Sequence, residues 1–188
     1  DCELLYQRAL ESHRNHDRPG CLAALELLLA EKPEHTDARL RYATVLAEHD
    51  RPQDALVEAE TLLRNAPENV EVLRFKADLL RDSNQLEAAA NVYTQLISLG
   101  TDQYGVLLER AKVRMTARQW PEATKDLSEL LLQNPNNIVL LKQRALALQK
   151  QFQWSMAIAD WTQIGLVDNT NVEAMEARAD AFLTLGET

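Results

Sequence analysis

Small residues recur along this 188-residue chain at a fixed interval of 34 positions. Alanine supplies only 25 of the 188 residues, so eleven equivalent positions filled by alanine or cysteine are far from chance. An interval of this length indicates stacked copies of one structural unit. One series consists of Ala9, Ala43, Ala77, Ala111, Ala145 and Ala179, and the other of Cys21, Ala55, Ala89, Ala123 and Ala157.

Closely crossing helices explain the two small-residue series. A large side chain at a crossing point forces two helices apart, which costs about 1–3 kcal/mol. Large apolar residues lie between the series at helical spacing and follow the same interval. Each interval therefore predicts two helices that pack face to face. The large residues are Leu62, Leu96, Leu130 and Ile164 in one set, and Leu73, Leu107, Leu141 and Met175 in the other.

Helix-breaking residues mark the ends of the expected helices. The apolar pattern is interrupted within a repeat at 50–52, 83–84 and 118–121, and prolines at 33, 67 and 135 end the second helices. The corresponding proline is missing at Thr101. With 32 leucines and 25 alanines against five glycines and six prolines, little of the chain is left for loops.

The interval, both small-residue series, the prolines and the segment Asn134-Pro135-Asn136-Asn137 resemble the tetratricopeptide repeat family over Cys2 to Gly186. The resemblance implies one all-α domain over residues 1–188, a right-handed superhelical solenoid of antiparallel helix pairs with about 11 helices. First helices would line a concave groove. Repeats are expected at 2–35, 36–69, 70–103, 104–137 and 138–171, with a half repeat or cap at 172–188.

Charge and composition exclude several classes of function. A net charge of −9 argues against nucleic acid as a partner, and no apolar run approaches the roughly 20 residues that cross a bilayer. Because the chain starts at Asp1 without a leader, we expect a fragment of a longer protein, which leaves its compartment and oligomeric state open.

No cofactor, metal site or catalytic centre is expected. Cys2 and Cys21 are too few for a disulfide framework and are expected to be unbridged. His13 and His16 lack a cysteine or acidic partner at ligand spacing. Phosphate-binding glycine loops, Gly-x-Ser-x-Gly and His-Glu-x-x-His are absent from the sequence, so an enzyme is not expected.

Several residues are more simply explained by packing than by ligand binding. Asp126 and Asp160 follow Arg110 and Arg144 at a spacing of 16 positions, which predicts ion pairs within a repeat, and Glu58 stands in the same relation to Tyr42. Gly165 occupies the position of Leu131 one interval earlier, which predicts either a loosened second helix or a close approach by a neighbour. Core packing is expected for Trp120, Trp154 and Trp161.

The first helices change character along the chain. Helical phase turns fourteen residues of the first three repeats inward: Glu3, Tyr6, Leu10, His13, Arg14, Asp37, Leu40, Thr44, Ala47, Glu71, Arg74, Asp78, Arg81 and Asp82. Residues 1–103 carry 19 acidic and 11 basic side chains, whereas residues 104–171 carry 6 and 8. We expect lysines without a facing acid to bind a protein segment with acidic and apolar side chains; the alternative is a solvated groove lined by ordinary helix formers. The predicted binding residues are Leu108, Lys112, Met115, Lys142, Leu146 and Lys150, with Arg74 and Arg81 at the edge.

The leading hypothesis is therefore a non-enzymatic protein-interaction scaffold. A second is a repeat region that recruits substrates or partners for a larger enzyme or for an export or assembly machine. RNA binding is opposed by the net charge and by the scarcity of inward-facing aromatics other than Tyr6. Residue pairs such as Lys142 with Leu146 do not match the lysine–asparagine pairs with which some family members clamp a chaperone's carboxyl terminus.

Overall fold

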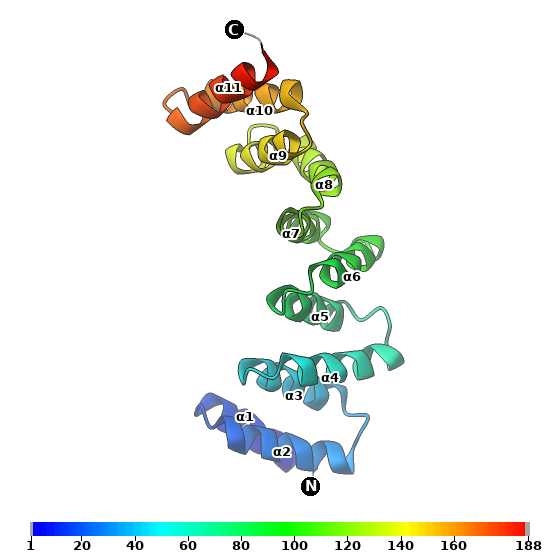
Figure 1. Cartoon of the computed structure of the whole chain (residues 1–188). Coiled ribbons are helices and arrows are strands. Elements are labelled where there is room, and N and C mark those ends of the chain that lie inside the picture. Colours follow the sequence, from blue (N-terminus) through cyan, green and yellow to red (C-terminus); the bar gives the residue numbers. More distant parts are fainter. Residues whose placement is uncertain (1, 187–188) are drawn as a thin grey trace. The chain divides into compact units, whose positions relative to one another are not determined.

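A computed structural model describes residues 2–186, which form eleven α-helices and no strand (Figure 1). The expected all-α class and the expected number of helices are confirmed. The chain divides into two compact units, at 1–85 and 86–188. The first unit holds α1 (Cys2–Arg14), α2 (Arg18–Glu31), α3 (Thr36–Glu48), α4 (Pro52–Asn65) and α5 (Val70–Asp82). The second holds α6 (Leu86–Ser98), α7 (Gln103–Thr116), α8 (Trp120–Gln133), α9 (Ile138–Lys150), α10 (Trp154–Val167) and α11 (Val172–Leu185).

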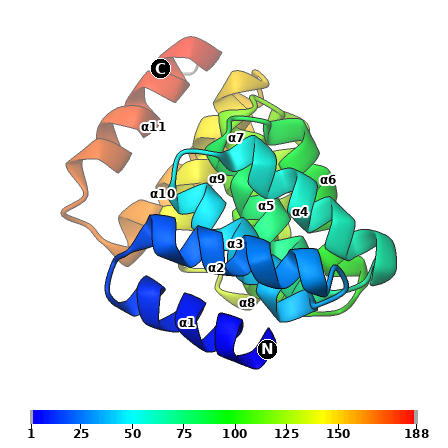
Figure 2. The same cartoon turned by 90° about the horizontal axis from the view of Figure 1, so that it is seen from below.

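Within each unit, consecutive helices pack against one another, and α1 and α2 run antiparallel in Figure 2. The first residues of the second helices α2, α4, α6, α8 and α10 follow the same fixed interval as the small residues. Pro52 and Pro121 occupy the first turns of α4 and α8, where a missing backbone N–H leaves no hydrogen bond unmade. Side chains of Asn69, Asn137 and Asn171 cap the first helices α5, α9 and α11.

The tight turn within each pair contains one residue in the left-handed region. The five residues lie 34 positions apart, have φ between 56° and 60°, and are all exposed. None of them is a glycine, although a side chain in this region costs about 1–2 kcal/mol. The same turn conformation therefore forms with five different residue types at this position. They are His16, Asp50, Asn84, Arg118 and Phe152.

Both small-residue series lie at helix crossings, as the sequence predicts. Ten of the eleven residues are completely buried at 0% exposure. The exception is Ala179 on α11, which is exposed because the described residues include no second helix paired with α11. Close crossing of a first and a second helix is thus the feature that buries these positions.

The core of the second unit runs along α7 to α11 and includes Trp161 at 2% exposure, whereas Trp120 and Trp154 are half-buried. A Cβ atom added to Gly165 on α10 meets nothing within 4 Å. The expectation of a close approach by a neighbour at Gly165 is therefore wrong, because the space there is open. A loosened α10 stays a prediction.

Candidate functional site

In the second unit, two arginines each join three helices through the same set of hydrogen bonds. Arg110 on α7 donates two hydrogen bonds to Asp126 on α8, at 3.0 Å from Nε and 2.7 Å from Nη2, and a third from Nη1 to Thr94 on α6 at 3.0 Å. Arg144 on α9 repeats these bonds to Asp160 on α10, at 2.9 and 2.6 Å, and to Ser128 on α8 at 3.1 Å. The predicted ion pairs are confirmed. We call the two arrangements the Arg110 latch and the Arg144 latch.

The latch carboxylates are buried, and their surroundings satisfy them. Asp126 and Asp160 are 1% and 4% exposed. Asp126 also accepts a 2.6 Å hydrogen bond from Arg114, a partner that the repeat interval does not reveal. Buried charges are tolerated when they are paired and hydrogen-bonded in this way, so packing between helices accounts for these groups without a ligand.

The equivalent positions of the first unit use different chemistry. Tyr42 donates a 2.8 Å hydrogen bond to Glu26 on α2, and Lys76 forms a 3.0 Å ion pair with Glu60 on α4. Glu58, at the spacing from Tyr42 that the latch aspartates have from their arginines, forms an ion pair with Arg39. Burial and the hydrogen bond to Glu26 raise the pKa of Tyr42 to about 12.

The first helices of the first unit form a polar pocket of about 240 Å³. Its lining comes from α1, α3 and α5, which are successive first helices, and five of its six residues are among the fourteen that helical phase turns inward. The side chains of Asp37, Arg41 and Glu71 make no hydrogen bond or ion pair with any described residue. Two carboxylates and one guanidinium thus line the pocket, and this excess of negative charge suits a cationic ligand group. The lining residues are Tyr6, Asp37, Leu40, Arg41, Thr44 and Glu71.

The structure places six of the eight predicted binding residues on α7 and α9 of the second unit, and we call these six the α7–α9 patch. Leu108 and Met115 are partly buried against the core, whereas Leu146 is 39% exposed and Lys150 is exposed. The patch therefore presents one exposed apolar side chain among its lysines. Its members are Leu108, Lys112, Met115, Lys142, Leu146 and Lys150.

The expectation that the patch lysines have no facing acid is wrong. Lys112 forms a 2.7 Å ion pair with Glu109 on the same helix, and Lys142 forms one of 2.7 Å with Glu173 on α11. All four side chains are at least 33% exposed. Exposed pairs contribute about 0–1 kcal/mol, so an incoming carboxylate can replace either glutamate at little cost.

The remaining two predicted binding residues, Arg74 and Arg81, lie on α5 in the first unit. Arg81 pairs with Asp78 at 2.9 Å and with Asp82 at 3.0 Å. Because these arginines belong to the other compact unit, their part in the predicted binding surface stays a prediction.

Sequence reasoning missed Arg41 in the pocket and the two glutamates at the patch. The spacing of Glu109 and Lys112, one helical turn apart, is a signal that could have found the first pair. Glu173 is distant from Lys142 in the sequence and becomes its neighbour only through the packing of the first helices.

The described residues 2–186 also bear on metal binding, thiol chemistry and membrane spans. Between residues 2 and 186, no group of three or more His, Cys, Asp and Glu side chains could hold a metal ion. Cys2 and Cys21 are free thiols, and burial raises the pKa of the Cys21 thiol. Among the eleven described helices, none combines the length and the apolarity that a membrane span requires.

Comparison with known families gives the fold its name. The tetratricopeptide repeat family model matches residues 6–79, which contain α2, α3 and α4 and most of α1 and α5. The chain has the tetratricopeptide repeat fold. No curated protein sequence matches it.

Solved structures of tetratricopeptide repeat proteins resemble this chain along most of its length. A tetratricopeptide repeat protein from Parabacteroides merdae is 16% identical, with a TM-score of 0.72 over 99% of this chain and 74% of that one. MamA is 13% identical, with a TM-score of 0.73 over 92% of this chain and 94% of its own. YrrB, described as having an unusual peptide-binding site, is 13% identical, with a TM-score of 0.65 over 87% and 84%. Such low identities establish a shared fold alone.

Proposed function

We propose that this protein is a non-enzymatic interaction scaffold that holds segments of partner proteins against its first helices. The observation that carries the proposal is the pocket on α1, α3 and α5, where successive first helices leave charged side chains without partners. Structural residues pair their charges, as the latches do, so unpaired charges that converge on one pocket favour recognition. The peptide-binding site named for YrrB supports the same class of function.

The second unit is proposed to bind a segment that carries acidic and apolar side chains. Lys112, Lys142 and Lys150 provide three ammonium groups, and Leu146 provides exposed apolar surface on the same two helices. Acidic side chains of the segment would replace Glu109 and Glu173 at the first two lysines. Binding of this kind depends on charge and is weakened by salt.

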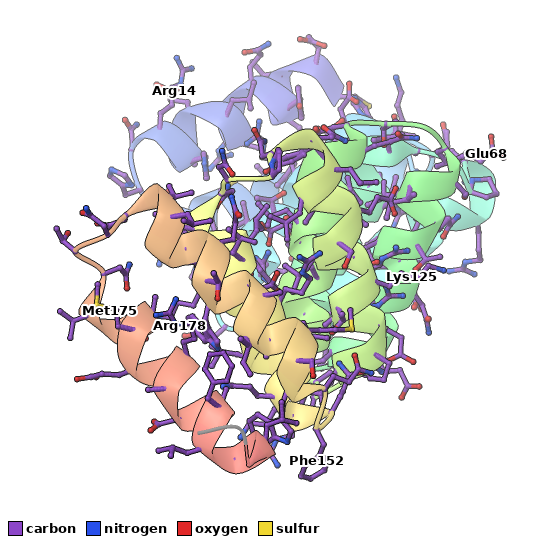
Figure 3. All side chains as sticks on the ribbon, turned by 90° about the horizontal axis from the view of Figure 1, so that it is seen from above. Arg14, Glu68, Lys125, Phe152, Met175 and Arg178 are labelled. Atoms are coloured by element: carbon purple, nitrogen blue, oxygen red, sulfur yellow. The ribbon has the colours of Figure 1, made fainter. Side chains whose placement is uncertain are left out.

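The test starts from selected peptides, because no partner is required in advance. Twelve-residue peptides displayed on phage are selected on the wild-type protein, and their affinities are then measured for two variants. Lys112→Glu with Lys142→Glu reverses the patch, and Arg118→Glu with Lys125→Glu makes the same charge change on the α7–α8 turn and on α8, where Lys125 lies exposed (Figure 3).

We expect acidic, leucine-rich peptides that bind at least tenfold more weakly to the patch variant and almost equally to the control variant. Circular dichroism checks that both variants keep their helix content. Equal losses in both variants would mean that only net charge is sensed, and the patch would then be rejected. Selection of basic peptides alone, with binding that depends on Asp37 and Glu71, would support the first-unit pocket and reject the α7–α9 patch.

A further inference from the structure

Two first helices of the second unit exchange charge through one ion pair. Lys142 on α9 lies 2.7 Å from Glu173 on α11, which follows it by 31 positions. Because the first helices follow the 34-residue interval, the same two positions recur in the first unit. There they are occupied by Tyr6 and Asp37, on α1 and α3, and by Leu40 and Glu71, on α3 and α5. The first unit thus keeps both carboxylates and lacks both lysines.

The two carboxylates without a lysine lie together at the first-unit pocket of about 240 Å³. Asp37 and Glu71 are exposed, and neither forms a hydrogen bond or ion pair with a described residue. The helix dipole favours acidic residues in a first turn, which accounts for their presence at the start of α3 and α5. It does not account for the open space beside them. The pocket therefore combines room with negative charge where the second unit has an ammonium group.

The rest of the lining suits an ammonium group at the end of an aliphatic side chain. Leu40 offers apolar surface to methylene groups, and the ring of Tyr6 offers a π face to a cation. This ring packs against His35, with the two centroids 5.4 Å apart. The hydroxyl of Thr44 donates to the carbonyl of Leu40 at 2.9 Å, so its own oxygen remains an acceptor. A lysine has three N–H donors to share among such oxygens.

A metal ion or a free small molecule fits the pocket less well. Among residues 2–186, no group of three or more His, Cys, Asp and Glu side chains could hold a metal ion. Arg41 also lines the pocket, and its positive charge disfavours a bare divalent ion. The volume of about 240 Å³ lies below the roughly 300–1,000 Å³ of small-molecule sites. A single basic side chain of a protein segment matches both the charge and the size.

We propose that the first-unit pocket binds the side chain of a lysine from a partner protein, whose ammonium group pairs with Asp37 and Glu71. The contact reproduces, between two proteins, the one that Lys142 makes with Glu173 inside the second unit. This proposal rests on the proposed scaffold function and names the group that one of its sites recognises. The two units then prefer segments of opposite charge, basic for the first and acidic for the second.

The probe is one lysine inside an otherwise uncharged peptide. Two phage libraries are selected on the whole chain, one with lysine and one with methionine fixed at the centre, and neither has other charged residues. We expect enrichment of the lysine library alone. Fluorescence anisotropy of the best labelled peptide should show at least tenfold weaker binding after acetylation of its lysine, which removes the charge. Enrichment of neither library, equal enrichment of both, or unchanged binding after acetylation would overturn the proposal.

Two matched double variants locate the site. Asp37→Asn with Glu71→Gln removes both pocket carboxylates and should weaken binding of the lysine peptide at least tenfold. Glu34→Gln with Glu68→Gln makes the same charge change three positions earlier, in the turns before α3 and α5, and should leave binding nearly unchanged. All four residues are exposed, so neither variant disturbs the core. A control variant that loses as much affinity as the pocket variant would show a response to net charge, against the proposal.

Two single positions test the pocket from within. Arg41→Gln removes the charge that opposes the lysine and should strengthen binding several-fold, whereas Arg64→Gln on α4 should not. Leu40→Lys places an ammonium group beside Glu71 and should block the peptide. Leu40→Gln shares the loss of the leucine but adds no charge, so it should retain most of the binding. Equal affinities of the Leu40→Lys and Leu40→Gln proteins would contradict the proposed location.

Failure of the lysine site and failure of the scaffold function give different results. If the pocket alone is wrong, acidic peptides still bind and still depend on Lys112 and Lys142 of the α7–α9 patch. If neither acidic nor lysine peptides bind, the scaffold function is rejected together with both sites.

Discussion

At the position before the small residue of a first helix, the second unit carries Arg110, Arg144 and Arg178, whereas the first unit carries Arg8, Tyr42 and Lys76. Arg110 and Arg144 each reach a buried aspartate on the next helix by two bonds. Tyr42 and Lys76 instead reach glutamates on the preceding helix by single bonds. The same fold therefore joins its helices by buried, bidentate charge pairs in one unit and by partly exposed single bonds in the other.

The difference shows that small-residue crossings, which both units share, are sufficient for the arrangement of helices. The latches add a constraint on the relative position of the helices. A buried carboxylate has no alternative partner in water, so it fixes the relative position of the helices that surround it. A glutamate such as Glu60, with its side chain 58% exposed, keeps water as an alternative and constrains its neighbours less.

The largest expected effect comes from breaking a latch. Asp126→Asn leaves Arg110 and Arg114 buried without a counter-charge and should lower the free energy of unfolding of the second unit by about 3–5 kcal/mol. Glu60→Gln in the first unit should cost less than about 1 kcal/mol. All three tryptophans lie in the second unit, so urea unfolding followed by tryptophan fluorescence reports on that unit and circular dichroism on both. Equal losses for the two variants would remove the distinction between the units.

The second effect concerns the crossings and should not distinguish the units. Ala43→Leu and Ala145→Leu each place a large side chain at a fully buried crossing, which should cost about 1–3 kcal/mol. Ala179→Leu is the matched control, because this alanine is exposed and the change should cost less than about 0.5 kcal/mol. A silent Ala43→Leu beside a costly Ala145→Leu would extend the difference between the units from charge to packing.

The crossings and the latch pairs could be predicted from the sequence, whereas other contacts could not. Both Arg110 and Arg144 and the small residues occupy positions that recur at every interval, so periodicity predicts their contacts. The neighbouring repeats have leucines at the position of Arg114, so the repeat interval does not predict its bond to Asp126. Glu26 and Glu58 lie at equal sequence distances before and after Tyr42, so spacing alone cannot tell which one it contacts. Tyr42 bonds to Glu26, whereas Glu58 pairs with Arg39.

The candidate site was predictable to a similar extent. Helical phase correctly turned Asp37, Leu40 and Glu71 toward a common surface, because phase depends only on spacing along a helix. Partners of the patch lysines depend on side-chain reach and on the neighbouring helix. Glu173 meets Lys142 only because α9 and α11 present adjacent first-helix surfaces.

A smaller effect tests whether the second unit is uniformly rigid. Gly165→Ala fills open space in the last turn of α10 and should raise the free energy of unfolding by up to about 1 kcal/mol. Hydrogen exchange of residues 161–167 should slow in the variant. Gly105→Ala is the contrasting change, because its Cβ would lie 2.3 Å from the Asp102 carboxylate that caps α7, so no gain is expected there. No slowing at 161–167 would mean that the latches already hold α10 tightly.

The smallest effect appears only at alkaline pH. The folded-state pKa of Tyr42 is about 12 and its ordinary value is 10.0, so folding favours the neutral phenol. This contribution to stability is complete below pH 10 and is lost as the pH rises toward 12. Tyr42→Phe should remove that loss, as measured by thermal unfolding of the first unit between about pH 9 and pH 12. Absorbance at about 295 nm that shows Tyr42 ionising near its ordinary pKa in the folded protein would contradict the prediction.

The left-handed residues of the tight turns have a practical consequence. Because these turns fix the backbone and leave the side chain in solvent, the chain provides five attachment points with one common local geometry, and none of them takes part in the core. A cysteine-reactive dye at each point, in a background without Cys2 and Cys21, would report the unfolding of each helix pair with the same local environment. Differences among the five signals would then measure the repeats themselves and not the placement of the dye. The points are His16, Asp50, Asn84, Arg118 and Phe152.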